Sequence, residues 1–128
     1  MLLRKYLSLI GIGSAKIDLI LPKDTYVPGE HINGYFLLKG GTIEQTLKRI
    51  DCDLVRIEEG KGQEDIVDTT TILTSKIIQS EEANQIPFTF CLPASIQASN
   101  EEVSYRFKTK LTFNEGVKSI DQDNIVIL

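Results

Sequence analysis

The chain has 128 residues, of which 41% are hydrophobic and 25% charged, and its formal net charge at pH 7 is −4. This length suits one domain with its own hydrophobic core, and the composition is that of a folded rather than a disordered protein. The excess of acidic residues argues against a nucleic-acid-binding protein, because neutralising phosphates requires an excess of lysine and arginine.

The first ten residues have the periodicity of a helix. The apolar residues that share one helical face are Leu2, Leu3, Tyr6, Leu7 and Ile10. Arg4 and Lys5 lie on the opposite side, and Gly11 and Gly13 end the pattern. We therefore expect residues 1–13 to form a short helix and a glycine hinge. Because so short a helix is marginally stable alone, it must pack on another surface. That surface is either its own domain, a partner protein or a membrane.

This N-terminal stretch does not resemble a targeting or membrane-spanning segment. A spanning helix needs about 20 apolar residues. A signal peptide needs a longer uninterrupted apolar run followed by a cleavage site with small residues. Neither is present in the sequence. We therefore expect the protein to be cytoplasmic.

From residue 16 onward the apolar residues alternate with polar ones, which is typical of β-strands. The alternation predicts about seven strands, within residues 17–21, 32–38, 50–54, 66–79, 86–92, 103–113 and 125–128; residues 66–79 form either one strand or two short ones. Turn signals separate them, including Pro28-Gly29 and a charged hairpin loop at residues 58–65. Helices do not alternate with the strands. The pattern therefore predicts an all-β fold, a two-sheet antiparallel β-sandwich of the immunoglobulin-like kind.

Three segments in the middle of the chain resemble the arrestin-like N-terminal domain. In that domain a Pro-Gly-Glu turn opens a strand that contains an inward glycine. Residues 26–40 resemble this segment, with the turn beginning at Pro28 and the inward glycine at Gly34. Residues 86–93 resemble its Pro-Phe-x-Phe-x-Leu-Pro strand, and residues 103–108 resemble the strand that follows.

Within that group the sequence is similar to the sporulation-control family, the relatives of stage-zero sporulation protein M. Residues 11–18, 39–45 and 121–125 carry this resemblance, which covers nearly the whole chain. It implies an arrestin-like domain over residues 1–128 and a regulatory role in sporulation through protein binding. The family continues into a second, similar sandwich. The chain is then either a truncated form or a naturally short version, and its ending in an apolar strand at residues 125–128 favours truncation.

The residues that catalysis or metal binding requires are sparse. His31 is the one histidine in the sequence, and a nucleophile–base pair usually needs histidine. Cys52 and Cys91 are too few for a disulfide framework and lie in apolar segments, where we expect them to be structural. Asp121 and Asp123 lack the glycine and distal glutamate of a calcium loop, so we interpret them as turn residues. We predict no enzyme activity, no metal and no cofactor.

The glycines at residues 11–16 superficially resemble a phosphate-binding loop. Such a loop follows a strand and opens a helix, whereas here the expected helix comes first and a strand follows. We interpret Gly11 and Gly13 as the points where the chain reverses between helix and sheet.

Arg106, Lys108 and Lys110 are the candidate partner-binding residues within the sandwich. Alternation places them on one face of one strand, at intervals of about 6.6–7 Å. Such a row either pairs internally, with Asp51 and Asp53 as candidate partners, or docks an acidic segment of another protein.

Two functions remain open at this point. The first is a regulatory protein-binding module, in which an exposed edge strand adds a strand from a partner or from a second copy. The second is a membrane-surface adaptor that docks through Arg4 and Lys5. Membrane contact through two cations is weak, because each basic residue near an anionic surface contributes about 1 kcal/mol.

Overall fold

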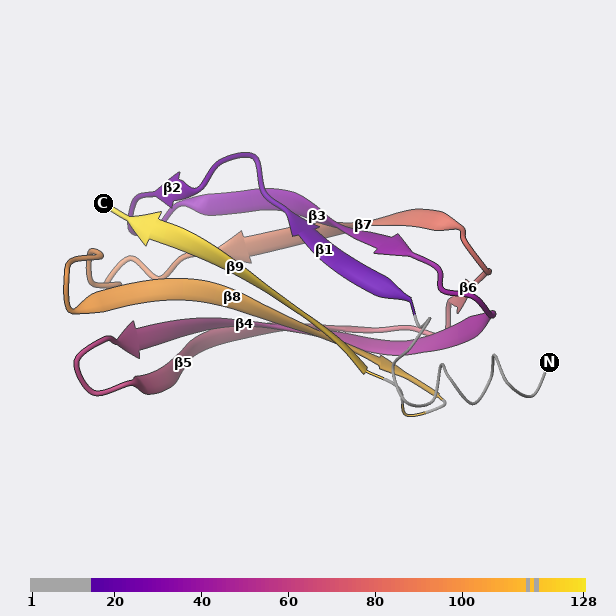
Figure 1. Cartoon of the computed structure of the whole chain (residues 1–128). Coiled ribbons are helices and arrows are strands. Elements are labelled where there is room, and N and C mark those ends of the chain that lie inside the picture. The colour runs from indigo at the N-terminus through magenta and orange to yellow at the C-terminus, as the bar shows by residue number, and fades with distance from the viewer. Residues whose placement is uncertain (1–14, 115, 117) are drawn as a thin grey trace.

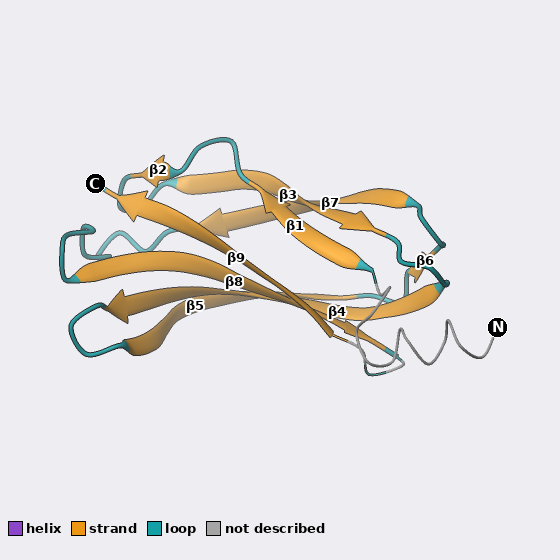
Figure 2. Ribbon diagram, in the orientation of Figure 1, coloured by secondary structure: helices purple, strands orange, loops and turns teal. Residues whose placement is uncertain are grey.

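Two β-sheets packed face to face make up the computed structural model, which describes residues 15–114, 116 and 118–128 (Figures 1 and 2). The smaller sheet has the strand order β1 (Lys16–Ile20), β3 (His31–Lys39), β7 (Ala83–Cys91). Both of its strand pairs are antiparallel. No helix in the described part of the chain is long and apolar enough to cross a membrane.

The larger sheet has the strand order β2 (Thr25–Tyr26), β9 (Lys118–Ile127), β8 (Val103–Phe113), β4 (Gln45–Glu58), β5 (Gln63–Leu73). A short strand, β6 (Ile77–Ile78), also pairs with β4. Pairing is antiparallel throughout this sheet except between β2 and β9, which run parallel.

The predicted all-β, two-sheet architecture is confirmed, but several boundaries were wrong: β4 is longer than predicted, residues 63–65 belong to β5 rather than to the hairpin loop, and β9 begins at Lys118. Asp121 and Asp123 are not turn residues: they lie inside β9, opposite Thr109 and Phe107 of β8. The first half of β9 is rich in polar residues, so its hydrophobic pattern is weak, and pairing along β8 sets its conformation instead. The predicted N-terminal helix and glycine hinge at residues 1–13 lie outside the described residues.

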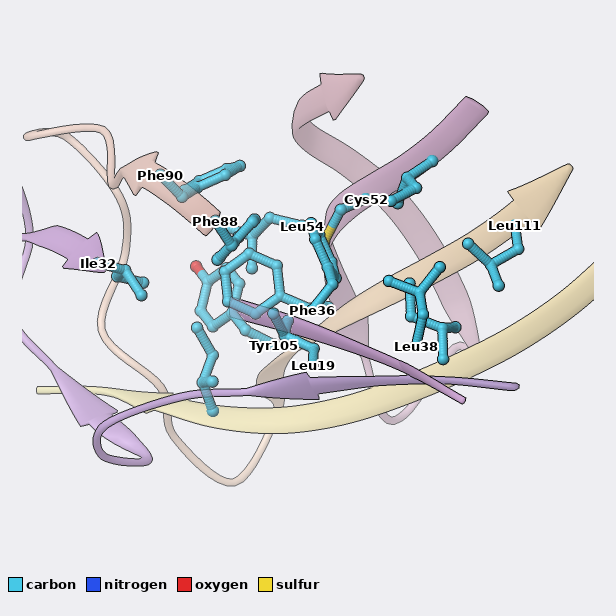
Figure 3. Packing of buried hydrophobic residues seen from close by; sticks show 14 of the residues in the cluster. Leu19, Ile32, Phe36, Leu38, Cys52, Leu54, Phe88, Phe90, Tyr105 and Leu111 are labelled. Carbon is cyan, nitrogen blue, oxygen red and sulfur yellow. The ribbon is translucent and has the colours of Figure 1, made fainter. Parts of the chain in front are cut away.

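Aromatic rings from both sheets form the centre of the core (Figure 3). Phe107 of β8 meets two rings of β7 edge-on, at centroid distances of 5.5 Å to Phe88 and 5.2 Å to Phe90. Phe88 also meets Phe36 of β3 edge-on at 5.1 Å. Edge-to-face pairs at these distances add to the stabilisation from apolar burial. The alternation that predicted the strands therefore supplies the residues that join the two sheets.

Close backbone contact positions β1 at one side of the sandwich. A Cβ atom on Gly34 of β3 would lie 2.3 Å from the carbonyl oxygen of Ile20, so only glycine allows this approach. On its other side β1 lies against β9, the last strand of the chain (Figure 1).

Candidate functional site

The predicted cationic row lies together on the outer face of β8. Arg106 and Lys108 are half-buried, whereas Lys110 is exposed. The register places Lys108 opposite Asp53 and Lys110 opposite Asp51 on the neighbouring strand β4. The row therefore exists as the alternation predicted, beside the two predicted acidic residues.

The cations of the row form their closest contacts with other side chains. Lys108 Nζ forms an ion pair with Glu64 Oε2 of β5. Arg106 Nη1 donates a hydrogen bond to Gln122 Oε1 of β9 at 2.8 Å. Lys110 is not within 4.0 Å of an acidic oxygen in the described part of the chain, although its charge contributes to lowering the pKa of Asp51.

Asp51 and Asp53 accept hydrogen bonds from side chains other than the predicted cationic row. The guanidinium of Arg49 donates to both oxygens of Asp51, from Nε at 2.9 Å and from Nη2 at 2.8 Å. This bidentate contact is the main cause that holds the pKa of Asp51 below its usual range. Thr71 and Thr69 of β5 donate hydroxyl hydrogen bonds to Asp51 and Asp53 at 2.9 and 2.8 Å. The outer face is therefore largely neutralised within the domain.

A hollow of about 500 Å³ lies on the same outer face. Its lining includes charged residues of β4 and β8 together with the exposed Ile120 of β9: Arg49, Asp51, Asp53, Lys108, Lys110 and Ile120. The hollow mixes both charge signs and has one large apolar side chain. Its lining combines charged and hydroxyl groups and includes no histidine or cysteine.

The edges of the two sheets differ in how they are protected. In β7, Pro87 lies in the middle of the strand and lacks the N–H that a partner strand would use. Along β1, Leu19 N–H donates to the carboxylate of Asp121 at 3.0 Å. Strand β2 has only two residues. Proline, side-chain capping and shortness are ways in which natural sheets block unwanted pairing.

Beyond Thr69, whose amide is capped by Asp68 Oδ1 at 2.8 Å, strand β5 is a long edge without such protection. It has 11 residues and, within the described chain, pairs only with β4. A bulge at Val67 interrupts the register, and residues 69–73 beyond it are regularly paired. Two large apolar side chains project into solvent from this strand, Ile66 and Leu73, which are 63% and 74% exposed.

Three aspartates meet where the smaller sheet approaches the larger one. Asp18 comes from β1, whereas Asp121 and Asp123 come from β9, and one carboxylate oxygen of each lies within 4.8 Å of the other two. Burial, followed by contact with Asp121, raises the pKa of Asp123 to about 7. Burial and Asp121 also raise the pKa of Asp18. Carboxylates so close together disfavour full ionisation.

The sequence pattern did not predict this cluster, because Asp121 and Asp123 were interpreted as turn residues. A signal was present: Asp121, Asp123, Ile125 and Ile127 follow the two-residue period of one strand face. Their partner Asp18 is about a hundred positions earlier in the chain, and only the folded structure brings it there. Acidic clusters of this kind are common without a metal, and we assign none here.

The remaining predicted residues lie apart from these surfaces. His31 is exposed, as expected, and its Nε2 lies 3.8 Å from Cys91 Sγ across the β3–β7 pair. Both cysteines are free, but only Cys52 is a buried structural residue, whereas Cys91 is exposed because it lies on the outer face of β7. Arg4 and Lys5 lie outside the described residues.

Comparison with known proteins gives one consistent relationship. The family model described as SpoOM protein matches residues 3–128. Sporulation-control protein spo0M of Bacillus subtilis (strain 168) is 34% identical over 130 residues, which cover 97% of this chain and 50% of the relative. The chain thus spans about half the length of that curated relative.

Solved structures agree with this relationship. The crystal structure of Spo0M from Bacillus subtilis superimposes with a TM-score of 0.80 at 33% identity, covering 91% of this chain and 50% of that one. A Niemann-Pick type C2 protein from the Japanese carpenter ant superimposes with a TM-score of 0.61 over 90% of this chain and 93% of that one, at only 9% identity. The second likeness concerns the fold alone.

Proposed function

The chain belongs to the SpoOM protein family, as its resemblance to the sporulation-control proteins indicated, and on that premise we propose that it is a non-enzymatic regulatory module in the control of sporulation. It acts by binding another protein, and the open edge of β5 is the observation that carries this proposal. The sheet edge offers backbone hydrogen bonds to a partner strand, which is a common way for β-sheets to bind peptides.

Backbone geometry identifies which groups of β5 face outward. Thr74 N–H donates to Lys48 O on the β4 side at 3.0 Å. Because N–H groups alternate in direction along an antiparallel strand, those of Leu73, Thr71 and Thr69 point away from β4. Thr69 N–H is capped by Asp68 Oδ1 at 2.8 Å. The amides of Thr71 and Leu73 are therefore the donors offered to a partner.

The side chains around this edge define the chemistry of the partner. Glu64, Asp65 and Asp68 make β5 acidic, and Ile66 and Leu73 are exposed apolar residues. An extended segment that carries basic and apolar residues complements this edge. Pairing between two copies through β5 would bring these acidic residues together. We therefore favour a different protein over a second copy as the partner.

The row Arg106, Lys108 and Lys110 has a secondary role in this proposal. Lys108 and Arg106 are engaged with Glu64 and Gln122. Lys110 is the exposed member, and it lines the hollow on the outer face. It is therefore the residue of the row that an acidic group of the partner contacts.

A proline in β5 tests the docking edge. Thr71→Pro removes an outward amide and leaves the amides that bond β4 in place. Affinity capture from sporulating cells should then recover at least about tenfold less partner, because one lost hydrogen bond and a steric clash exceed 1.4 kcal/mol. Thr89→Pro in β7 is the matched control, since its amide shares the outward direction of Pro87 on an edge that is already interrupted.

Both variants are first compared with the unmodified protein by circular dichroism, so that only folded proteins enter the comparison. Equal recovery of the same partner by Thr71→Pro and the unmodified protein would rule out β5 as the docking edge. Light scattering separates the remaining alternative: a concentration-dependent dimer that Thr71→Pro abolishes would identify a second copy as the occupant.

A further inference from the structure

The aspartate cluster lies at the seam between the two sheets. Asp18 belongs to the smaller sheet, and Asp121 and Asp123 belong to the larger one. Leu19 N–H, next to Asp18, donates to Asp121 Oδ2 at 3.0 Å. We propose that these three carboxylates form a proton-operated latch between the sheets, closed while they share a proton and loosened when that proton is lost. This inference is independent of the docking edge on β5.

An unsatisfied oxygen supports a shared proton. Asp123 Oδ2 is buried and has no hydrogen-bond partner in the structure. A proton between Asp123 and Asp121 supplies the missing donor and removes one of three crowded negative charges. Asp121 Oδ2 meanwhile keeps its hydrogen bond from Leu19. One proton therefore satisfies the buried oxygen and leaves the hydrogen bond across the seam in place.

The residues of the larger sheet around the cluster leave its charge uncompensated. Strand β8 places Phe107 opposite Asp123 and Thr109 opposite Asp121, and neither is charged. Behind Thr109, on β4, Cys52 receives the Thr109 hydroxyl at 3.4 Å. Burial raises the pKa of the Cys52 thiol to about 12, so it stays neutral.

On the side of the smaller sheet, two lysines come near the cluster without pairing to it. Lys23 and Asp24 line a hollow of about 580 Å³ together with Asp18 and Asp123. Lys23 is ion-paired with Glu30 and lies over the ring of Tyr26. Strand β3 places Leu37 opposite Asp18, and Lys16, two residues before Asp18, lies across from Lys39. Among the lysine and arginine side chains that the structure describes, none forms an ion pair with the three aspartates.

The direction of the response to pH follows from the raised pKa of Asp123, which burial lifts to about 7. The folded protein then binds a proton that the unfolded chain has already lost above pH 4. This proton stabilises the fold at low pH, and the stabilisation disappears as the pH rises through about 7. The latch therefore holds β1 against β9 in mild acid and loosens around and above neutrality.

The first experiment measures the titration of the cluster in the unmodified protein. Carboxyl carbon NMR should show the Asp123 side chain titrating near pH 7. Over the same range, the protection factor of the Leu19 amide against hydrogen exchange, corrected for intrinsic rates, should fall by about tenfold or more. An Asp123 carboxyl that titrates below about pH 5, or Leu19 protection that is constant from pH 5.5 to 8, would overturn the latch.

The second experiment uses Asp123→Asn, which keeps the shape and stays neutral. Relative to the unmodified protein, its melting temperature should rise by about 3–6 °C between pH 5 and pH 8. Asp65→Asn, an exposed carboxylate on β5, is the matched control and should show no such pH-dependent difference. A difference that does not grow between pH 5 and 8 would contradict the proposal.

Calcium distinguishes a proton latch from a cation site. Millimolar Ca²⁺ should leave the melting temperature at pH 8 unchanged, because a latch needs only the proton. If Ca²⁺ raises the melting temperature of the unmodified protein and not that of Asp123→Asn, the cluster is a cation site and the proton latch is wrong.

Discussion

The two long sides of this sandwich end in different ways. On one side, β1 lies against β9, and Asp121 caps the amide of Leu19. On the other side, β5 ends the larger sheet, with outward amides and exposed Leu73. Both sides share the same aromatic core, so the difference lies in the few residues at each border. The comparison shows that side chains, rather than the fold, decide which border leaves backbone groups uncovered.

The largest effect should come from the core that both sides share. Phe107→Ala removes a fully buried ring that contacts Phe88 and Phe90. We expect a loss of about 3–5 kcal/mol in the free energy of unfolding, measured by urea denaturation. A loss below about 1 kcal/mol would mean that this aromatic cluster does not hold the two sheets together. The shared core could then no longer be treated as common to the two borders.

A smaller but selective effect is expected from Gly34→Ala, which acts on the closed border. The added Cβ would lie 2.3 Å from Ile20 O, so β1 must move away from β3. We expect about 1–3 kcal/mol of destabilisation by urea denaturation. The control is Gly60→Ala, at a hairpin position where nothing lies within 4 Å of the new atom and stability should be nearly unchanged. Equal effects would show that β1 is not tightly packed.

The next effect concerns pH, where the two sides should respond in opposite directions. Contact with Arg49 holds the pKa of Asp51, beside β5, below its usual range. A lowered pKa stabilises the fold above pH about 4, and this stabilisation is lost as the pH falls further. Asp51→Asn should therefore lower the urea midpoint by more at pH 6 than at pH 3. A midpoint difference that is the same at both values would show that ionised Asp51 does not stabilise the fold.

The smallest effect on stability should come from the open border itself. Leu73 is 74% exposed, so Leu73→Lys should change the free energy of unfolding by less than about 0.5 kcal/mol. Because the partner proposed for β5 is basic, the same variant should weaken partner capture. A large loss of stability would show that Leu73 packs against the domain and that this border is not open.

Period-two alternation predicted most of the fold, because strands such as β7 and β8 bury every second residue. It did not reveal the polar beginning of β9, which pairing with β8 determines. It placed Arg106, Lys108 and Lys110 on one face correctly. The partners of this face depend on strand order and side-chain reach, which bring in Glu64 and Arg49. Strand order also makes β5 an edge, and alternation along a single strand contains no information about that.

The hydrogen bond from Leu19 to Asp121 has a consequence for how the chain folds as it is synthesised. The two residues are 102 positions apart, so the Leu19 amide on the edge of β1 stays uncapped until Asp121 has been synthesised. Contacts between such distant segments form slowly, because a long loop must close first. On the ribosome, β1 and β3 emerge early with that edge uncovered. During this interval the exposed edge of β1 is most prone to aggregation, so a chaperone is needed more then than after folding is complete.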